Sequence, residues 1–178
     1  MLKKMRGFTL IEMLIVVAII GILAALLIPN ALSAIQKAKQ KGTMKDINSI
    51  AIALTDYVTD KGATPTQTGA LASGSSFYTA LSGFYLKVIP QNDQWGGAFM
   101  VWCGSAANSC YGGVSGCGAD DFVVASQGRD KAATTIAFNP VNPSTAFFDI
   151  SGMTSFNEDL VIWNGSWIHV PKIAPTGT

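Results

Sequence analysis

The chain has 178 residues, 49% of them hydrophobic and only 13% charged, and its twelve Lys and Arg residues nearly balance eleven Asp and Glu residues. A formal net charge of +1 supplies no basic field of the kind that binds nucleic acid, so no nucleic-acid partner is predicted. The sequence contains no nucleophile elbow, phosphate-binding loop or metal-ligand cluster, and we therefore predict no enzyme. Without the apolar segment near the N-terminus roughly 150 residues remain, enough for one domain with its own core.

The first thirty residues have the pattern of a membrane segment. Lys3, Lys4 and Arg6 precede Gly7, and the apolar residues 8–28 follow with a single charge, Glu12. As a helix this segment would be roughly 32 Å long, and a bilayer hydrocarbon core is about 30 Å thick. Because Lys3, Lys4 and Arg6 directly precede the segment, whereas the first basic residue after it is Lys37, we expect the N-terminal end to stay in the cytoplasm. A carboxylate at membrane depth costs on the order of 3 kcal/mol, so Glu12 is expected to have a function.

Two simpler interpretations of the segment stay open. One is a secretory signal peptide that is cut near residues 31–33, although its apolar core would be unusually long and would contain Glu12. The other is a plain single-span anchor.

The sequence of residues 6–12, RGFTLIE, resembles the class III signal of the type IV pilin superfamily, which includes type IV pilins and the pseudopilins of type II secretion. The resemblance implies that prepilin peptidase cuts after Gly7, so that residues 1–7 are a leader peptide, and then methylates the new N-terminal residue, Phe8. It also implies that Glu12 neutralises the amine of the adjacent subunit in a filament. Removal of the leader leaves nine basic and eleven acidic residues, a side-chain charge of −2.

A single helix is predicted over residues 8–61. Residues 8–29 would be its transmembrane and filament-core part, and residues 30–62 its amphipathic part. Gly21 and Pro29, which the resemblance also covers, mark a soft stretch, where Pro29 should kink or loosen the helix rather than end it. The apolar stripe that would face a head domain consists of Ile47, Ile50, Ala51, Leu54, Tyr57 and Val58. Gly62 is the expected C-terminal cap.

Residues 63–178 are predicted to form a globular head with an antiparallel β-sheet. We expect a short helix at residues 75–81 and strands at residues 98–103, 121–126, 145–150, 160–163 and 166–170. The clearest signal is Asn164-Gly165 between the last two strands, because Asn-Gly is the strongest short hairpin signal. The predicted fold class is therefore α+β: a long N-terminal helix packed against a C-terminal antiparallel sheet, the pilin fold.

Two patches of the head resemble major pseudopilins. Residues 89–99 resemble their Pro-x-Asp-Pro-Trp-Gly-Asn-Pro-Tyr stretch, with Gln94, Gly97 and Ala98 as departures, and predict a tight turn with Trp95 anchored in the core.

The second patch consists of residues 125–130 and residues 157–160, and it resembles the calcium-binding loop of major pseudopilins. The resemblance implies side-chain ligands from Asp130, Asp159 and Glu158 with help from the carbonyl of Gln127, and calcium prefers such oxygen ligands. The alternative is that Asp130 caps a turn while Glu158 and Asp159 are solvated. No other cofactor is predicted.

Cys103, Cys110 and Cys117 are disulfide candidates, because the head is expected outside the cytoplasm, where disulfides persist. Three cysteines allow one bridge, and the sequence does not choose among the three pairings. A zinc site that uses them with His169, the only histidine, has no recognised spacing.

Together these observations predict the structural subunit of a pilus-like helical filament, stored in the inner membrane and assembled from it. The expected partners are further copies of the chain, prepilin peptidase, an ATPase-driven inner-membrane platform and minor pilins or pseudopilins. The filament would be an extracellular pilus for adhesion, motility or uptake, or alternatively the periplasmic pseudopilus of a type II secretion system. An alternative of another class is a single-span envelope binding protein that does not polymerise.

Overall fold

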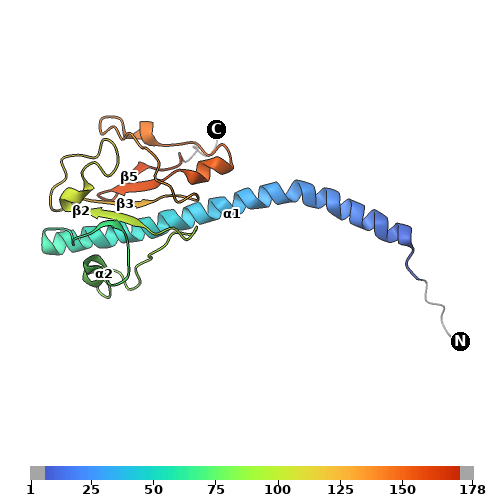
Figure 1. Cartoon of the computed structure of the whole chain (residues 1–178), viewed down its shortest axis with the longest axis horizontal. Coiled ribbons are helices and arrows are strands. Elements are labelled where there is room, and N and C mark those ends of the chain that lie inside the picture. The colour runs from blue at the N-terminus through green and yellow to red at the C-terminus, as the bar shows by residue number, and fades with distance from the viewer. Residues whose placement is uncertain (1–6, 173–178) are drawn as a thin grey trace, which may run out of the picture. The chain divides into compact units, whose positions relative to one another are not determined.

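A computed structural model of the chain describes residues 7–172 (Figure 1). The chain divides into two compact units, residues 1–36 and residues 37–178, and helix α1, Leu10–Lys61, contributes to both. Lys3, Lys4 and Arg6 of the predicted leader lie outside the described residues.

The N-terminal unit is an apolar helix with exposed side chains. Among the described residues α1 is the one helix long and apolar enough to cross a membrane, with a mean hydropathy of 3.0 in its most apolar window. Phe8, Leu10 and Leu27 are each at least 70% exposed, so these apolar side chains are not buried by other residues of the chain. Pro29 lies inside α1 without ending it, as predicted.

The second part of α1 packs into the head through the predicted stripe. Ile47, Ile50, Ala51 and Leu54 are almost completely buried, and Tyr57 packs partly buried against the same cluster. The helix ends as expected, where the amide of Gly62 donates to the carbonyl of Val58 (2.7 Å). The short helix α2, Ser76–Leu81, begins at Ser75, whose side chain accepts a hydrogen bond from the amide of Tyr78.

Within the described residues the head contains one five-stranded antiparallel sheet in the order β1-β2-β3-β4-β5. Its strands are β1 Thr68–Ala70, β2 Met100–Cys103, β3 Phe122–Ser126, β4 Leu160–Trp163 and β5 Ser166–His169. The turn between β4 and β5 has positive φ at both Asn164 (47°) and Gly165 (80°), as the hairpin signal predicted.

The sheet is buried on both faces. One face packs on α1 through residues such as Val101, Val124 and Ile162. The other face carries Val123 and Val161 and is covered by two long connections that bring in a second set of buried apolar side chains. That set consists of Ala107, Tyr111, Val114, Cys117, Ile136 and Phe138. All five residues of β3 are buried, which is why this strand shows no alternating pattern in the sequence.

The predicted long helix, central strands and hairpin are confirmed, and two details differ. Residues 145–150 are not a strand: Pro143 begins a 3₁₀-helix, Pro143–Ala146, and Phe148 then forms only an isolated bridge to Pro171. Strand β1 was missed because it has three residues and one of them, Gly69, has low β-propensity.

Candidate functional site

The residues predicted to be processed lie at the start of α1. Phe8 is 79% exposed, and a side chain built on Gly7 would meet no atom within 4 Å, so the Gly7–Phe8 bond has no packed neighbours. Thr9 and Glu12 form a reciprocal capping box. The amide of Glu12 donates to the hydroxyl of Thr9 (3.3 Å), and the Thr9 amide and hydroxyl donate to Glu12 Oε2 (2.8 and 2.7 Å).

This geometry gives Glu12 a second role that the sequence analysis missed. In the single chain its carboxylate satisfies the first turn of α1, whereas the resemblance implied a partner in a neighbouring subunit. The capping-box spacing of Thr9 and Glu12 was the available signal. The softening expected at Gly21 and Pro29 stays a prediction, because α1 is continuous through both residues.

The two segments of the predicted calcium patch do lie together. The amide of Arg129 donates to the carbonyl of Phe156 (2.9 Å), and Arg129 Nε donates to Asn157 Oδ1 (3.0 Å). Gly128 fits closely, because a side chain there would lie 2.8 Å from the carbonyl oxygens of Asn157 and Glu158.

The four predicted ligands nevertheless do not form one cluster. Gln127 is half-buried, and Asp130 is exposed and accepts a hydrogen bond from the amide of Ala132 (3.1 Å), so it caps a local turn. Glu158 Oε2 lies 3.9 Å from His169 Nε2. Asp159 is completely buried and not solvated, contrary to the alternative interpretation.

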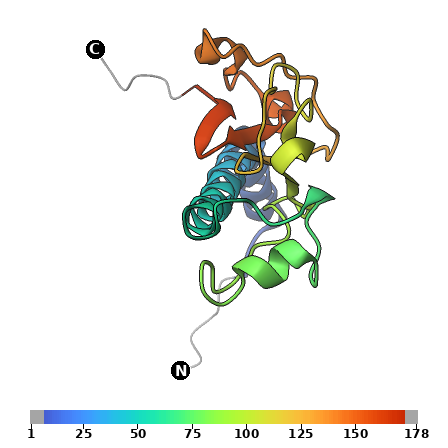
Figure 2. The same ribbon diagram turned by 90° about the vertical axis from the view of Figure 1, so that its left-hand side faces the viewer.

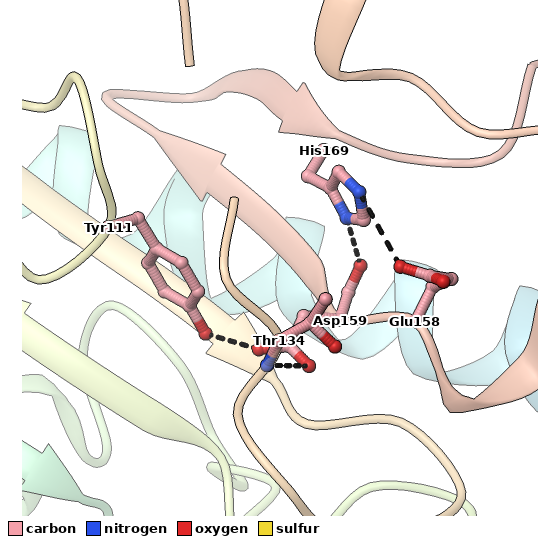
Figure 3. A network of polar contacts seen from close by, with 5 residues as sticks. All are labelled: Tyr111, Thr134, Glu158, Asp159 and His169. Atoms are coloured by element: carbon pink, nitrogen blue, oxygen red, sulfur yellow. Dashed lines mark hydrogen bonds and ion pairs between the residues drawn. The ribbon is translucent and has the colours of Figure 1, made fainter. Parts of the chain in front are cut away.

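Asp159 is the centre of a polar network that joins several elements of the head (Figure 3). Its Oδ2 accepts from the hydroxyl of Tyr111 (2.7 Å), its Oδ1 from the amide of Thr134 (3.2 Å), and its carbonyl oxygen lies 2.6 Å from His169 Nδ1. Both side-chain oxygens of Asp159 are already hydrogen-bonded within the protein and the residue is completely buried, so its carboxylate is not presented to a calcium ion in this arrangement. Within residues 7–172 no group of three or more His, Cys, Asp or Glu side chains is placed to hold a metal.

Burial shifts the pKa values of the titrating groups in this network. Burial raises the pKa of Asp159 to about 6, although the hydrogen bonds from Tyr111 and Thr134 oppose the shift. Burial also raises the pKa of Tyr111 far above its usual range, and the Asp159 carboxylate adds to this effect. Burial lowers the pKa of His169, which therefore favours the neutral imidazole. Sequence reasoning missed Tyr111 and Thr134, since both lie in connections without periodicity.

The tight turn at residues 93–97 is organised by Asp93. Its buried carboxylate accepts from the amides of Trp95 (2.9 Å) and Gly97 (2.8 Å) and from the hydroxyl of Ser126 (2.7 Å). The prediction that Trp95 is anchored in the core is wrong: Trp95 is half-buried, and the completely buried aromatic side chain here is Phe99.

All three cysteines are present as free thiols. Cys103 belongs to the cluster between α1 and the sheet, whereas Cys110 and Cys117 belong to the cluster on the opposite face. Burial raises the pKa of Cys103 to about 12 and that of Cys110 to about 11, so both are protonated at neutral pH. A disulfide and its pairing stay a prediction.

The apolar helix with exposed side chains, its capped start and the sheet head define the class: a pilin-like protein whose N-terminal segment is suited to a membrane. The sequence matches the prokaryotic N-terminal methylation motif at residues 2–28, and residues 30–136 match the protein G family of the type II secretion system (T2SS). The chain belongs to this family. The prediction of the pilin superfamily is thereby confirmed, and the match favours its pseudopilin branch.

Individual relatives agree with the family match. The chain is similar to type II secretion system core protein G of Aeromonas hydrophila, with 34% identity over 106 residues, 56% of this chain and 73% of the relative. The corresponding protein of Vibrio cholerae is 36% identical over 108 residues, again 56% of this chain and 73% of the relative. That of Pseudomonas aeruginosa is 39% identical over 105 residues, 55% of this chain and 73% of the relative. No solved structure matches the chain significantly.

Proposed function

We propose that this chain is the major subunit of a type II secretion pseudopilus. In this proposal it is cut after Gly7, methylated at Phe8, held in the inner membrane by residues 8–29 and assembled into a periplasmic filament with further copies of itself. The observation that carries the proposal is the exposed apolar helix with the Thr9–Glu12 cap, joined to a head of the T2SS protein G family.

The exposed helix supports membrane storage followed by assembly. An apolar surface of this size is stable only in lipid or against other protein, and the large apolar side chains of residues 8–28 are exposed. A filament provides one, since the helices of neighbouring copies can replace the lipid.

The decisive experiment separates the two roles of Glu12, the cap of its own helix and the partner of a neighbouring amine. Three full-length variants are expressed with the secretion machinery: Glu12→Gln, Glu12→Ala and Thr9→Ala. Glutamine can also close a capping box but carries no charge. If Glu12 pairs with the amine of the next subunit, Glu12→Gln and Glu12→Ala are both processed yet fail to assemble, whereas Thr9→Ala assembles.

The readouts are the N-terminal residue of the mature protein, determined by mass spectrometry, and the amount of sheared filament. Assembly of Glu12→Gln at the wild-type level would refute the charge role. A mature protein that still begins at Met1 would refute processing and favour a non-polymerising anchor. Processed wild-type protein confined to the envelope, with secretion lost on its deletion, supports the pseudopilus; abundant protein in sheared surface fibres would indicate a pilus instead.

A further inference from the structure

The head holds one aromatic side chain out into solvent in a fixed position. Phe84 is 83% exposed and lies in the connection after α2, where Gly83 N donates to the Leu86 carbonyl (3.1 Å) and Leu86 N to the Leu81 carbonyl (3.1 Å). Its ring packs edge-on against Tyr85 (4.9 Å between centroids), and the Tyr85 hydroxyl donates to Asp60 (3.0 Å). Phe84 is thus presented by a hydrogen-bonded turn that is tied to α1.

The same head contains an apolar groove at the junction of α1 and the end of edge strand β5. Its volume is about 410 Å³, and it is lined by Met44, Phe147, Trp167, Val170, Pro171 and Lys172. Backbone hydrogen bonds from Phe148 to the Val170 carbonyl (3.2 Å) and from Lys172 to the Phe148 carbonyl (2.7 Å) hold its wall in place. Five of the six lining residues are apolar, so the groove suits an apolar side chain better than a polar ligand.

The projecting ring and the groove lie on different sides of the head. Helix α2 and the connection after it lie on one side of α1, and β5 lies on the other (Figures 1 and 2). Along α1, Met44 of the groove and Asp60 beside the projection are sixteen residues apart, roughly 24 Å at the α-helical rise. A projection cannot fill the groove of its own chain in this arrangement, but it can fill that of another copy.

The charges around the two features are complementary. Asp56 and Asp60 line the same shallow hollow as Phe84. The rim of the groove carries the ammonium group of Lys172, which forms an exposed ion pair with Asp149 (3.2 Å). Contact between Phe84 and the groove brings Asp56 and Asp60 toward Lys172. The existing ion pair of Lys172 with Asp149 is weak, because Asp149 is 73% exposed.

We propose that in the filament Phe84 of one subunit inserts into the groove lined by Met44, Trp167 and Val170 of another copy. The proposal rests on the proposed function, because it needs copies that assemble. A contact between two different surfaces of identical chains is heterologous, and it generates an open helical array when its rotation does not close a ring. The contact therefore also fixes an axial offset between the subunits it joins.

The test uses the full-length chain in cells that assemble the filament, with the photoreactive substitution Phe84→p-benzoylphenylalanine. Irradiation of sheared or envelope-bound filaments is expected to give dimers whose adducts map to peptides that contain Met44, Trp167 or Val170. The matched control is Val141→p-benzoylphenylalanine, since Val141 is 92% exposed and lines neither surface. It should not label the groove.

Filaments that assemble but carry the Phe84 adduct elsewhere, or on residues 173–178, would overturn the contact while leaving the proposed function intact. Absence of wild-type filaments would instead refute the proposed function.

A second variant, Phe84→Asp, should lower filament yield roughly tenfold or more, as expected for loss of a central aromatic anchor. Because Phe84 is exposed, the unfolding temperature of the head should not change, and Val141→Asp should assemble normally. Wild-type filament yield from Phe84→Asp would contradict the proposed contact.

Discussion

Replacing Tyr111 by phenylalanine tests whether the buried hydrogen bonds of Asp159 stabilise the head. The substitution removes one hydroxyl and keeps the ring, so the packing of Tyr111 against Trp102 (5.8 Å between centroids) is retained. Asp159 is completely buried, and the Tyr111 hydroxyl is one of the donors that satisfy its carboxylate. A hydrogen bond to an ionised group contributes about 1.5–3 kcal/mol, so we expect a loss of about 2 kcal/mol at pH 7.5.

The pH dependence makes the expectation specific. With a pKa of about 6 in the folded head, against 3.8 in the unfolded chain, Asp159 is ionised at pH 7.5 and mostly protonated at pH 5. Since folding raises this pKa, ionisation of Asp159 costs stability, which declines as the pH rises from about 4 to above 6. The Tyr111 hydroxyl offsets part of that cost. At pH 5 only a neutral hydrogen bond is lost, and the effect of Tyr111→Phe should fall to about 1 kcal/mol.

His169 has the opposite pH dependence. Its pKa is lowered by folding, so its contribution to stability is lost as the pH falls through about 6.5. This contribution is common to wild type and variant and cancels when their unfolding free energies are subtracted.

The assay is thermal unfolding of the detergent-solubilised full chain, followed by tryptophan fluorescence. All four tryptophans, Trp95, Trp102, Trp163 and Trp167, lie in the head, so the signal reports the head alone. A loss of 2 kcal/mol lowers the unfolding temperature by roughly 4–8 °C in a domain of this size. The matched control is Tyr85→Phe, which removes the hydroxyl bonded to the exposed Asp60 and should cost well below 1 kcal/mol. Equal effects of the two substitutions, or no pH dependence for Tyr111→Phe, would refute the reasoning.

Three further predictions concern the head. Gly113→Ala should prevent stable folding, because its Cβ would overlap the carbonyl oxygen of Phe138. Gly116→Ala, also at positive φ but in open space, should cost only about 1 kcal/mol. Circular dichroism and the yield of detergent-solubilised full chain distinguish the two variants. Asp93→Ala should destabilise the head by about 2–4 kcal/mol, because it leaves two amides and one hydroxyl without their acceptor. In the same unfolding assay Asp130→Ala should cost about 1 kcal/mol or less, because the exposed Asp130 accepts one hydrogen bond, from the amide of Ala132. Calcium and a calcium chelator should both leave the unfolding temperature unchanged, because both side-chain oxygens of the buried Asp159 are hydrogen-bonded within the protein, and a rise of several degrees with calcium would contradict this.

The parts of the fold that could be predicted carry a local signal. The stripe around Ile50 repeats with the period of a helix, and Asn164-Gly165 specifies its turn by backbone conformation alone. Residues 145–150 resembled a strand by their apolar content, but the preceding Pro143 fixes φ and begins a 3₁₀-helix. Local composition therefore predicted well where one short-range effect dominates.

The polar network could not be predicted in the same way. Tyr111, Thr134 and Asp159 come from three separate segments, and only their meeting in the fold makes Asp159 a buried acceptor. The resemblance implied that Asp130 and Asp159 bind one calcium ion. In the structure Asp130 accepts a hydrogen bond from the amide of Ala132, whereas Asp159 accepts hydrogen bonds from Tyr111 and Thr134. Trp95 was taken for the core aromatic of the turn, but the sheet register places Phe99 inside instead.

The contrast between the two units bears on what can direct assembly. In a bilayer the exposed side chains of residues 8–28 are already in an apolar solvent, so moving them against neighbouring helices gains little hydrophobic free energy. A preference for the filament must then come from interactions that lipid cannot replace. In the proposed assembly the charge of Glu12 is one, because an amine at membrane depth would offset part of its cost. The proposed insertion of Phe84 into the groove of another copy is the second, because both surfaces lie in the head and are exposed to water before they meet.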